Sequence, residues 1–550
     1  MRLLWRAVVG LCLALATWAT AGAQDVRSPD AALAQVLEEA RASCGQPNPD
    51  RLVKVLCGGT LRIGVRDYYP LFSTRDGEKR DGYELDIADA IADRLGVKLE
   101  FVRVNAASRI PLLAEDRIDL VIATMGHNTQ RDSQVRFVRP HYYQSETTVV
   151  GPRAAIVASW LDMPGRTVCA TVGNGSNAEL VSHDVRLMLF DEAGVLPGKL
   201  RDGTCQLAAQ DDSFFAYYFT EPDFAAAFSQ KFGFAQVPWG MAVARTGSDR
   251  LARALDLMSQ IFHRDGVFLD IARKHHISTN FLREQQAVWK RIDCDTATGS
   301  TNQACILPAL DADLEPTSFA ARVSTFESWI NAKTGTSILL PMLKTVPAWS
   351  LFLGGVANSL ILIAGALLST LVFALLLGGA QAAPWRLLHW PAHALTVVLQ
   401  SSPIVLTLVI AAALAREFFD FSDVVALGAA IMALGLVNGS NAGQAISEAV
   451  ATVRAEDARD GVRRGHRFRR AVGRSSSQLV SFLVNAAKGT PIASFIGAPE
   501  LLSALTDITS FSTGRVTTYW LLLIFYIVVV MAVVWLCGRL QHWLARSYAT

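Results

Sequence analysis

Four short stretches of the 550-residue chain place polar and glycine residues directly after apolar runs that are typical of β-strands. They span residues 67–72, 124–131, 173–179 and 210–213. Together they offer a guanidinium group, one or two carboxylates, hydroxyl and glycine turns, and an aromatic face. This set suits a free α-amino acid. An arginine and N–H groups at a helix start bind its carboxylate, a buried carboxylate binds its ammonium group, and an apolar wall excludes water.

A predicted alternation of strands and helices must position these stretches. Residues 61–65, 98–104 and 119–123 have the composition of strands, and residues 83–95 carry apolar positions at helical spacing. Such an alternation predicts a parallel sheet covered on both faces, and ligands bind beyond the carboxyl ends of its strands. Taken singly, each polar stretch has an ordinary explanation, since an Asp-Asp pair before a helix is usually an N-cap. Their joint placement after successive strands predicts a ligand site.

Residues 60–293 resemble the two-lobed, type II periplasmic proteins that bind polar amino acids. The matching stretches include LRIGVRDYYPLFSTRDG from residue 61, IPLLAEDRIDLVIATMGHNTQR from residue 110 and AAQDDSFFAYY from residue 208. The resemblance implies an α/β fold and these ligand-binding residues: Tyr69, Thr124, Gly126, Arg131, Ser176, Asn177, Asp211 and Asp212. In this scheme Arg131 binds the ligand carboxylate, and Asp211, with Asp212 as its rival, binds the ammonium group.

The sequence departs from that family beside the arginine. The family usually shows T/S-x-T-P-E-R, whereas this chain has Gly126-His127-Asn128-Thr129-Gln130-Arg131, so Gly126 at the first hydroxyl position leaves a backbone donor only. Arg75, Arg109 and His127 lie near the loops that would line the side-chain pocket. They favour an acidic or amide ligand, although the same residues could equally be solvated.

The chain becomes apolar after about residue 307. Hydrophobic residues make up 51% of the sequence and charged residues 18%, and five long apolar segments hold much of this excess. The segments are residues 351–379, 392–415, 424–446, 478–498 and 519–538. Each roughly reaches the length of about 20 residues that a helix needs to cross a bilayer. We therefore predict five membrane spans.

Charge and targeting signals predict the orientation of these spans. Residues 1–23 combine a basic start, an apolar run and an Ala-x-Ala site, which indicates a cleaved signal peptide, with an uncleaved anchor as the alternative. The loop after the third span carries eight arginines against three acids over residues 454–474, which predicts that it faces the cytoplasm. We expect a bacterial inner-membrane protein whose binding domain lies in the periplasm.

Residues 351–550 resemble the five-span permease subunit of polar amino-acid ABC importers, among which fused receptor–permease chains occur. VANSLILIAGALLSTLVFALLLG and LVNAAKGTPIASFIGAPELLSALTDI carry the resemblance. It implies import of a polar amino acid, a separate cytoplasmic ATP-binding subunit and a second permease subunit, which we expect to be a second copy of this chain. The family's ATPase-coupling loop corresponds to Glu456, Ala458 and Gly461, with the glycine one residue early. Residues 24–59 then form an N-terminal extension and residues 294–350 a periplasmic linker.

Other functional classes find less support in the sequence. It contains no GxxxxGK[ST], HExxH, GxSxG or CxxC motif, so we expect no catalysis, cofactor or metal on this chain. A formal net charge of +2 argues against a nucleic-acid partner, whereas membrane lipid is expected. Two alternatives stay open: a membrane-anchored amino-acid sensor and a ligand-gated, channel-like receptor.

Six cysteines fall in the part expected outside the membrane: Cys44, Cys57, Cys169, Cys205, Cys294 and Cys305. An even number in an oxidising compartment indicates disulfides. Of the fifteen possible pairings we expect neighbours to pair, and a zinc site is the alternative.

Overall fold

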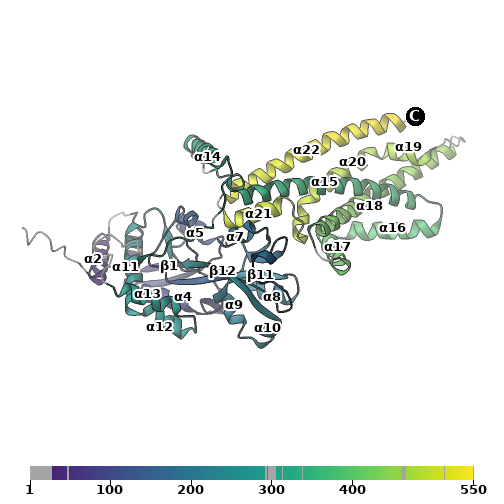
Figure 1. The fold of residues 1–550 in the computed structure, drawn as a ribbon. Coiled ribbons are helices and arrows are strands. Elements are labelled where there is room, and N and C mark those ends of the chain that lie inside the picture. Colours follow the sequence, from purple (N-terminus) through teal and green to yellow (C-terminus); the bar gives the residue numbers. More distant parts are fainter. Residues whose placement is uncertain are drawn as a thin grey trace, which may run out of the picture. The chain divides into compact units, whose positions relative to one another are not determined.

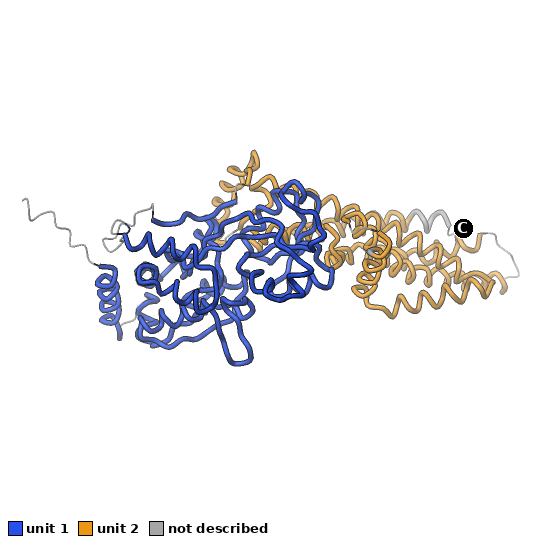
Figure 2. Tube along the Cα trace, turned by 60° about the horizontal axis from the view of Figure 1, so that its bottom comes forward, with its two compact units in different colours: residues 1–313 blue, residues 314–550 orange. Residues whose placement is uncertain are grey.

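The computed structural model describes residues 28–45, 49–291, 294, 305–312, 314–336, 338–419, 422–459, 466–512 and 514–548. The predicted signal peptide and Gly461 lie outside the described residues. The chain divides into two compact units, residues 1–313 and residues 314–550 (Figure 2).

The first unit contains two five-stranded sheets and a small three-stranded one. The first sheet has the order β5-β1-β6-β13-β7, and the second has the order β10-β9-β11-β8-β12. The strands of the first sheet are β1 (Thr60–Val65), β5 (Lys98–Arg103), β6 (Leu120–Val121), β7 (Val135–Phe137) and β13 (Ala242–Ala244). Those of the second are β8 (Tyr143–Pro152), β9 (Thr167–Thr171), β10 (Arg186–Phe190), β11 (Leu207–Asp211) and β12 (Phe228–Trp239). The small sheet is β2 (Tyr68–Tyr69), β3 (Ser73–Asp76) and β4 (Lys79–Asp81).

Both large sheets are mixed, so the expected parallel sheet is confirmed for the strands on which it was based, β1, β5 and β6, but not for the whole of either sheet. Strand β1 pairs parallel with β5 and β6, and β9 pairs parallel with β10 and β11. Strand β13 runs antiparallel to β6 and β7, and β8 runs antiparallel to β11 and β12. The cause is that the chain passes between the sheets twice, after β7 and after β12, and each passage delivers a strand of opposite direction. The result is two lobes with a double crossing.

Helices follow the strands that carry the polar stretches. The predicted helix over 83–95 is confirmed as α4 (Tyr83–Leu95). It begins after Gly82, which has φ 146°, and an added Cβ there would lie 2.2 Å from the carbonyl oxygen of Phe72, so only glycine fits this turn. The other helices near the polar stretches are short: α5 (Arg109–Ala114), α6 (Thr129–Asp132), α7 (Asn177–Ser182) and α9 (Asp212–Tyr218). The stretches themselves therefore lie in strand-to-helix turns.

The remaining helices complete the outside of this unit (Figure 1). They are α2 (Pro29–Ala42), α3 (Arg51–Gly58), α8 (Leu196–Arg201), α10 (Pro222–Ala227), α11 (Asp249–Asp265), α12 (Val267–Lys274) and α13 (Asn280–Trp289), with 3-10 turns η1 (Trp160–Asp162) and η2 (Ala193–Val195). The N-terminal extension packs as part of the unit, because Leu33 and Leu37 of α2 are buried in the same hydrophobic core as Leu255 of α11.

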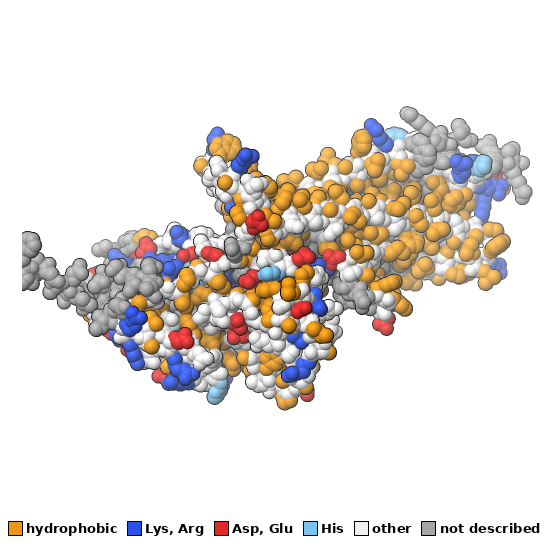
Figure 3. All heavy atoms as spheres, viewed as in Figure 1, with side chains coloured by type: hydrophobic (Ala, Val, Ile, Leu, Met, Phe, Trp, Pro, Cys, Tyr) orange, Lys and Arg blue, Asp and Glu red, His pale blue; other side chains and the backbone are white. Residues whose placement is uncertain are grey.

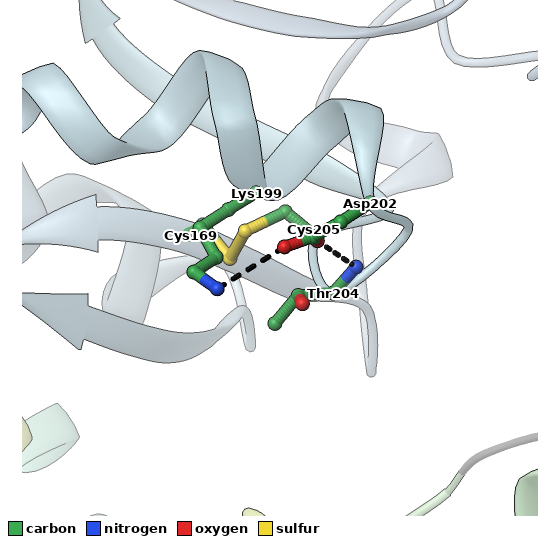
Figure 4. Close-up of a disulfide and its surroundings, with 5 residues drawn as sticks. All are labelled: Cys169, Lys199, Asp202, Thr204 and Cys205. Atoms are coloured by element: carbon green, nitrogen blue, oxygen red, sulfur yellow. Dashed lines mark hydrogen bonds and ion pairs between the residues drawn. A yellow bond between two sulfur atoms is a disulfide. The ribbon is translucent and has the colours of Figure 1, made fainter.

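Three disulfides join the cysteines as the neighbour pairing predicted: Cys44–Cys57, Cys169–Cys205 and Cys294–Cys305. Among the described residues no group of His, Cys, Asp and Glu could hold a metal ion, which leaves the zinc alternative without support there. Figure 4 shows the bridge from Cys169 in β9 to Cys205, which lies in the turn before β11. That turn is fixed further by the Asp202 side chain, which accepts from the Thr204 N–H at 2.9 Å. The bridge ties together two strands whose ends carry polar stretches.

The second unit is helical. Its long elements are α15 (Val346–Gln381), α16 (Arg386–Ser401), α17 (Ile404–Phe418), α18 (Asp423–Arg459), α20 (Ser476–Gly489) with η6 (Thr490–Ile496), and α22 (Arg515–Tyr548). Shorter ones are α14 (Ala320–Thr334), η5 (Pro341–Leu343), α19 (Arg467–Arg474) and α21 (Leu501–Phe511). Within the described residues, four helices are long and apolar enough to cross a membrane, or five if the bent pair α16–α17 forms one span.

The bend lies inside the second predicted span, residues 392–415. Helices α16 and α17 meet at 115° across Ser402 and Pro403. Proline lacks an N–H donor and disfavours helical geometry in the residue before it, so a continuous helix stops here. The predicted second span is therefore bent, and it counts as one span only if α16 and α17 cross the membrane together.

Large apolar side chains are exposed along the helices of this unit, as Figure 3 shows for one face. Leu368 on α15 is 64% exposed and Trp535 on α22 is 59% exposed. Inside the unit, α15 and α18 approach closely through small residues, and an added Cβ on Gly439 would lie 2.5 Å from the Cβ of Phe373. Exposed apolar faces and close packing through glycine are both typical of membrane helices.

Candidate functional site

A cleft in the first unit is lined by residues from both sheets and from the strand-to-helix turns. Its polar lining includes Arg66, Arg109, Thr124, Arg131, Ser176 and Asp211. Five of the predicted ligand residues therefore lie on one cavity: Thr124, Gly126, Arg131, Ser176 and Asp211. Three do not line it: Tyr69, Asn177 and Asp212.

Arg131 lies in α6, and backbone groups fix its guanidinium. Its Nη1 donates to the carbonyl oxygen of Gly126 and its Nη2 to that of Gly173, both at 2.5 Å. The Asn128 side chain accepts from the Arg131 N–H at 2.8 Å and caps the helix. Burial and the neighbouring Arg66 lower the pKa of Arg131 to about 10, against the attraction of Asp211. The group thus stays cationic at neutral pH and would be stabilised by an added anion.

Asp211 ends β11 and lies buried against Tyr69. The Tyr69 hydroxyl donates to Asp211 Oδ2 at 2.7 Å. Burial raises the pKa of Asp211 to about 6, although the Tyr69 hydrogen bond and the charge of Arg66 lower it. Tyr69 itself lies beneath the cleft, where its ring packs 6.1 Å from that of Trp239. It therefore positions Asp211 and does not form a wall.

Asp212, the alternative partner for the ligand ammonium group, instead makes hydrogen bonds within the fold. Its Oδ1 accepts from the Ser145 hydroxyl at 2.5 Å, from the Ser213 N–H at 2.7 Å and from the Glu146 N–H at 3.1 Å. These bonds fix the start of α9 against β8. The structure thus separates two adjacent carboxylates that the sequence could not distinguish.

Two further arginines line the cleft beside Arg131. Arg66 directly follows β1, and its guanidinium carbon lies 5.1 Å from the centroid of the Tyr69 ring. Arg109 begins α5 and donates from Nη1 to the carbonyl oxygens of Ala123 at 2.7 Å and Thr124 at 3.3 Å. Arg66 is 6% and Arg109 is 2% exposed, and in the part of the chain that the structure describes neither Nε atom has a hydrogen-bond partner. Burial lowers the pKa of Arg66, but Tyr68, Tyr69, Asp211 and Glu84 outweigh it and raise the pKa, so Arg109 is the less compensated of the two cations.

The positive and negative charges around these arginines do not balance. Burial, and then repulsion from Arg131 and Arg66, hold the pKa of Arg109 well below its usual range. Among the acids that line the cleft, Asp211 alone is buried, whereas Glu179 is half-buried and Asp311 is exposed. Glu84 lies deeper and is fully buried, where it accepts from the Thr124 N–H at 2.5 Å, and burial raises its pKa. The buried lining therefore holds more positive than negative charge.

Of the other predicted ligand residues, some line the cleft and one, Asn177, does not. The Thr124 hydroxyl faces the cleft from a backbone with φ 44°, and among the described residues it has no hydrogen-bond partner. Gly126 must be glycine here, since an added Cβ would lie 2.5 Å from Val237 Cγ1. Ser176 lines the cleft and its hydroxyl lies 2.7 Å from that of Thr147. Asn177 is buried and donates to the Thr171 carbonyl oxygen at 2.9 Å.

Of the three residues predicted near the pocket for the ligand side chain, two line the cleft and one does not. His127 and Arg109 line the cleft, whereas Arg75 is exposed in β3 and donates to the Gly77 carbonyl oxygen at 2.7 Å. Three residues that the sequence pattern did not indicate as ligand residues also line the cleft: Arg66, Gln210 and Trp239. For Arg66 the signal was present, because it is the first residue after a predicted strand.

Comparison with protein families matches residues 61–278 to the bacterial extracellular solute-binding proteins, family 3. These residues form a solute-binding domain with the two-lobed fold of type II periplasmic binding proteins. The membrane-helix unit lies outside the matched residues.

Individual relatives each match part of the chain. Cyclohexadienyl dehydratase of Pseudomonas aeruginosa is 27% identical over 173 residues, which are 30% of this chain and 64% of that protein. ABC transporter glutamine-binding protein GlnH of Bacillus subtilis is 24% identical over 232 residues, which are 41% of this chain and 84% of that protein. The chain spans between 32% and 64% of the length of the first four curated relatives that it matches. Among solved structures, an ancestral arginine-binding protein bound to arginine is 26% identical, covers 39% of this chain and 97% of its own, and has a TM-score of 0.37.

Proposed function

We propose that this chain captures an acidic amino acid outside the cytoplasmic membrane and passes it through its own helical unit, driven by a separate ATP-binding subunit. The observation that supports the ligand most directly is the unequal charge of the cleft. Arg66, Arg109 and Arg131 line it, and Asp211 is the buried carboxylate that faces them. Several relatives of residues 61–278 are named as amino-acid-binding proteins, which supports an amino acid as the ligand class.

Two of the charged groups suit the backbone of the ligand. Arg131, whose guanidinium is fixed by two carbonyl oxygens, binds the α-carboxylate, because a preorganised guanidinium loses little freedom when it forms such a bond. The Thr124 hydroxyl and the Gly126 N–H lie on the same cleft and add donors. Asp211, oriented by Tyr69, binds the α-ammonium group. A zwitterion bound in this way adds no net charge to the cleft.

The remaining two arginines determine which ligand side chain the cleft favours. With a zwitterion in place, the further buried acid beside Arg66 and Arg109 is Glu84, so two cations share one carboxylate, and an incompletely compensated buried cation is costly. A ligand with a second carboxylate neutralises them, an amide does so only through its dipole, and a cationic side chain adds repulsion. Glutamate or aspartate is therefore favoured over glutamine, and lysine or arginine is excluded. This narrows the expectation of an acidic or amide ligand to an acidic one.

The second unit supports a transport role by composition and length. It offers four helices, or five with the bent pair, that can cross a membrane, and a single set would enclose a pathway poorly. We propose a homodimer of this permease unit and an ATP-binding subunit at the cytoplasmic end of α18, where Glu456 and Ala458 lie. We further propose that the chain catalyses no reaction and needs no cofactor, since the charged residues of the cleft suit ligand binding.

Calorimetric titration of the full-length chain in lipid nanodiscs with the twenty amino acids tests the ligand. L-glutamate and L-aspartate should bind most tightly, and Arg131→Ala should weaken their binding by a factor on the order of 10² to 10³, because it leaves a buried ligand charge unpaired. Arg75→Ala is the matched control, since Arg75 is exposed outside the cleft, and it should bind like the wild type. Tightest binding of lysine or arginine, or an unchanged Arg131→Ala variant, would reject the proposal.

A further inference from the structure

The chain that leaves the first unit lies at the mouth of the cleft, because Leu310 and Asp311 line the cleft and are also exposed. Residues 305–312, here called the strap, begin at the Cys294–Cys305 disulfide and precede the second unit, which begins at residue 314. Leu310, Asp311 and Ala312 of the strap line the cleft together with the ligand residues. A binding protein needs only its two lobes to enclose a ligand, so a third segment at the mouth calls for an explanation.

The strap is held at both ends. At its start, the Cys294–Cys305 disulfide and Ile306 pack against Trp289 at the end of α13. At its far end, the Leu310 N–H donates to the carbonyl oxygen of His127 at 2.9 Å. Asp311 Oδ1 accepts from the Thr129 N–H at 2.8 Å, and its Oδ2 accepts from the Thr129 hydroxyl. The strap therefore has a defined seat on residues 127–129.

That seat is the first turn of the helix that carries Arg131. Helix α6 has only four residues, and Asn128 caps the Arg131 N–H while Asp311 takes the Thr129 N–H. A four-residue helix has too few internal hydrogen bonds to fix itself, so its caps decide how firmly Arg131 is held. The acceptor on the strap thus contributes to the position of the group that binds the ligand carboxylate.

We propose that Asp311 is a positioning residue for ligand binding, and that the strap closes the mouth of the cleft over the bound amino acid. This inference rests on the proposed function. When the strap is bound to residues 127–129, Asp311 holds Thr129 in place and thereby positions Arg131. Residues 310–312 then block the exit of the ligand from the cleft. When the strap lifts, the same step loosens Arg131 and opens the mouth. Because the next residues of the chain belong to the membrane-helix unit, the strap is the covalent path by which that unit can promote release.

The dissociation rate of radiolabelled L-glutamate from the full-length chain in nanodiscs tests this inference. Asp311→Ala should speed dissociation by about fivefold, a value discounted for the exposure of this carboxylate, with little change in the association rate. Asp311→Asn keeps an acceptor for the Thr129 N–H and should restore most of the wild-type rate. Glu315→Ala is the matched control, because Glu315 is an exposed acid four residues further along the chain, and it should behave like the wild type.

A double-mutant cycle with Thr129→Val removes the remaining ambiguity. If the two residues act through one contact, Thr129→Val together with Asp311→Ala should release glutamate no faster than Asp311→Ala alone. Additive effects of the two substitutions would contradict the role proposed for Asp311 and the strap. So would a dissociation rate that is unchanged in Asp311→Ala while the wild type binds glutamate. Either result leaves the proposed function intact. If wild type and Glu315→Ala both bind no amino acid, the proposed function fails, and this inference fails with it. An unchanged thermal unfolding midpoint in Asp311→Ala would show that the faster release is not general destabilisation.

Discussion

Asp211 and Arg131 face one cleft with opposite charge and with different electrostatic surroundings. Burial acts on both, yet Asp211 has the hydroxyl of Tyr69 as a partner, whereas Arg131 has only carbonyl oxygens and lies near a second cation. The carboxylate is thus close to its protonation point, with a pKa of about 6, and the guanidinium stays charged. A ligand ammonium group binds only the ionised carboxylate, so binding must depend on pH.

The first prediction concerns that dependence. Glutamate affinity should be constant from about pH 7 to 8 and should fall by about tenfold per unit below pH 6, because the ligand must displace a proton from Asp211. The ligand side chain, with an ordinary pKa near 4.3, stays ionised down to about pH 5. Calorimetry at several pH values measures the slope. In Asp211→Asn the affinity should be weak at pH 7.5 and flat with pH, and a slope that persists in this variant would assign the proton elsewhere.

The second prediction concerns Arg66 and ligand selectivity. Arg66→Gln removes one of the buried cations that line the cleft, so glutamate affinity should fall by roughly 10- to 100-fold while glutamine affinity changes much less. Competition titrations with both amino acids measure the ratio. Equal losses for glutamate and glutamine would mean that Arg66 contacts the shared part of the ligand.

At the scale of elements, three histidines join α11 to the first sheet. His263 of α11 donates from Nε2 to the carbonyl oxygen of His141 at 2.8 Å, and His141 Nε2 lies 2.8 Å from His127 Nδ1. Burial lowers the pKa of all three, and that of His263 to about 4. They lie buried and neutral, and His127 also lines the cleft.

The third prediction follows from the lowered pKa of His263. Its pKa is about 4 when folded and about 6.5 when unfolded, so between these values only the unfolded chain takes up the proton. Stability from this group is present above pH 6.5 and is lost as the pH falls, by about 2 kcal/mol between pH 7 and pH 5. Asp211 and Asp256 have raised pKa values and act in the opposite direction, so the comparison must be with a variant.

His263→Gln is that variant, because it keeps a donor for the His141 carbonyl oxygen and cannot titrate. Hydrogen exchange of α11 peptides at pH 7 and pH 5, corrected for the intrinsic exchange rate, should show a smaller loss of protection in His263→Gln than in the wild type. The same loss in both proteins would mean that His263 takes up a proton in the folded state.

The elements also show which features a sequence can predict. The strand-to-helix turns were visible because apolar runs end where polar residues begin, and they led to Arg131, Asp211 and Thr124 on one cleft. Asp211 and Asp212 could not be distinguished, because their roles depend on contacts with Tyr69 and Ser145, which are 142 and 67 residues distant. The mixed sheets arise from two crossings between lobes, and strand composition carries no information on direction. The bend at Pro403 was hidden because hydropathy averages over the residues on both sides of it.

At the scale of the whole molecule, the proposed function assigns binding and transport to different units of one chain, so variants should separate them. The C-terminal end of α18 is tied to α19 by Asp457, whose carboxylate contacts Arg467 Nε at 2.6 Å and Arg470 Nη1 at 2.9 Å. Glu456 contacts Arg474 Nη1 at 2.6 Å in the same place. These ion pairs join the two helices that flank the loop proposed to meet the ATPase.

The fourth prediction is that the ion pairs between α18 and α19 are needed for transport but not for ligand binding. In proteoliposomes that contain the chain, the ATP-binding subunit and internal ATP, Asp457→Ala should lower uptake of radiolabelled glutamate several-fold, because α19 loses its attachment to α18, while glutamate affinity stays at the wild-type value. Glu417→Gln is the matched control, since Glu417 is an exposed acid at the opposite end of the neighbouring helix α17, and its uptake should be unchanged. Uptake by the wild type without the ATPase would indicate a channel-like receptor. Binding with no uptake, even with the ATPase and ATP present, would indicate a sensor, because the helical unit would then register the bound ligand without moving it.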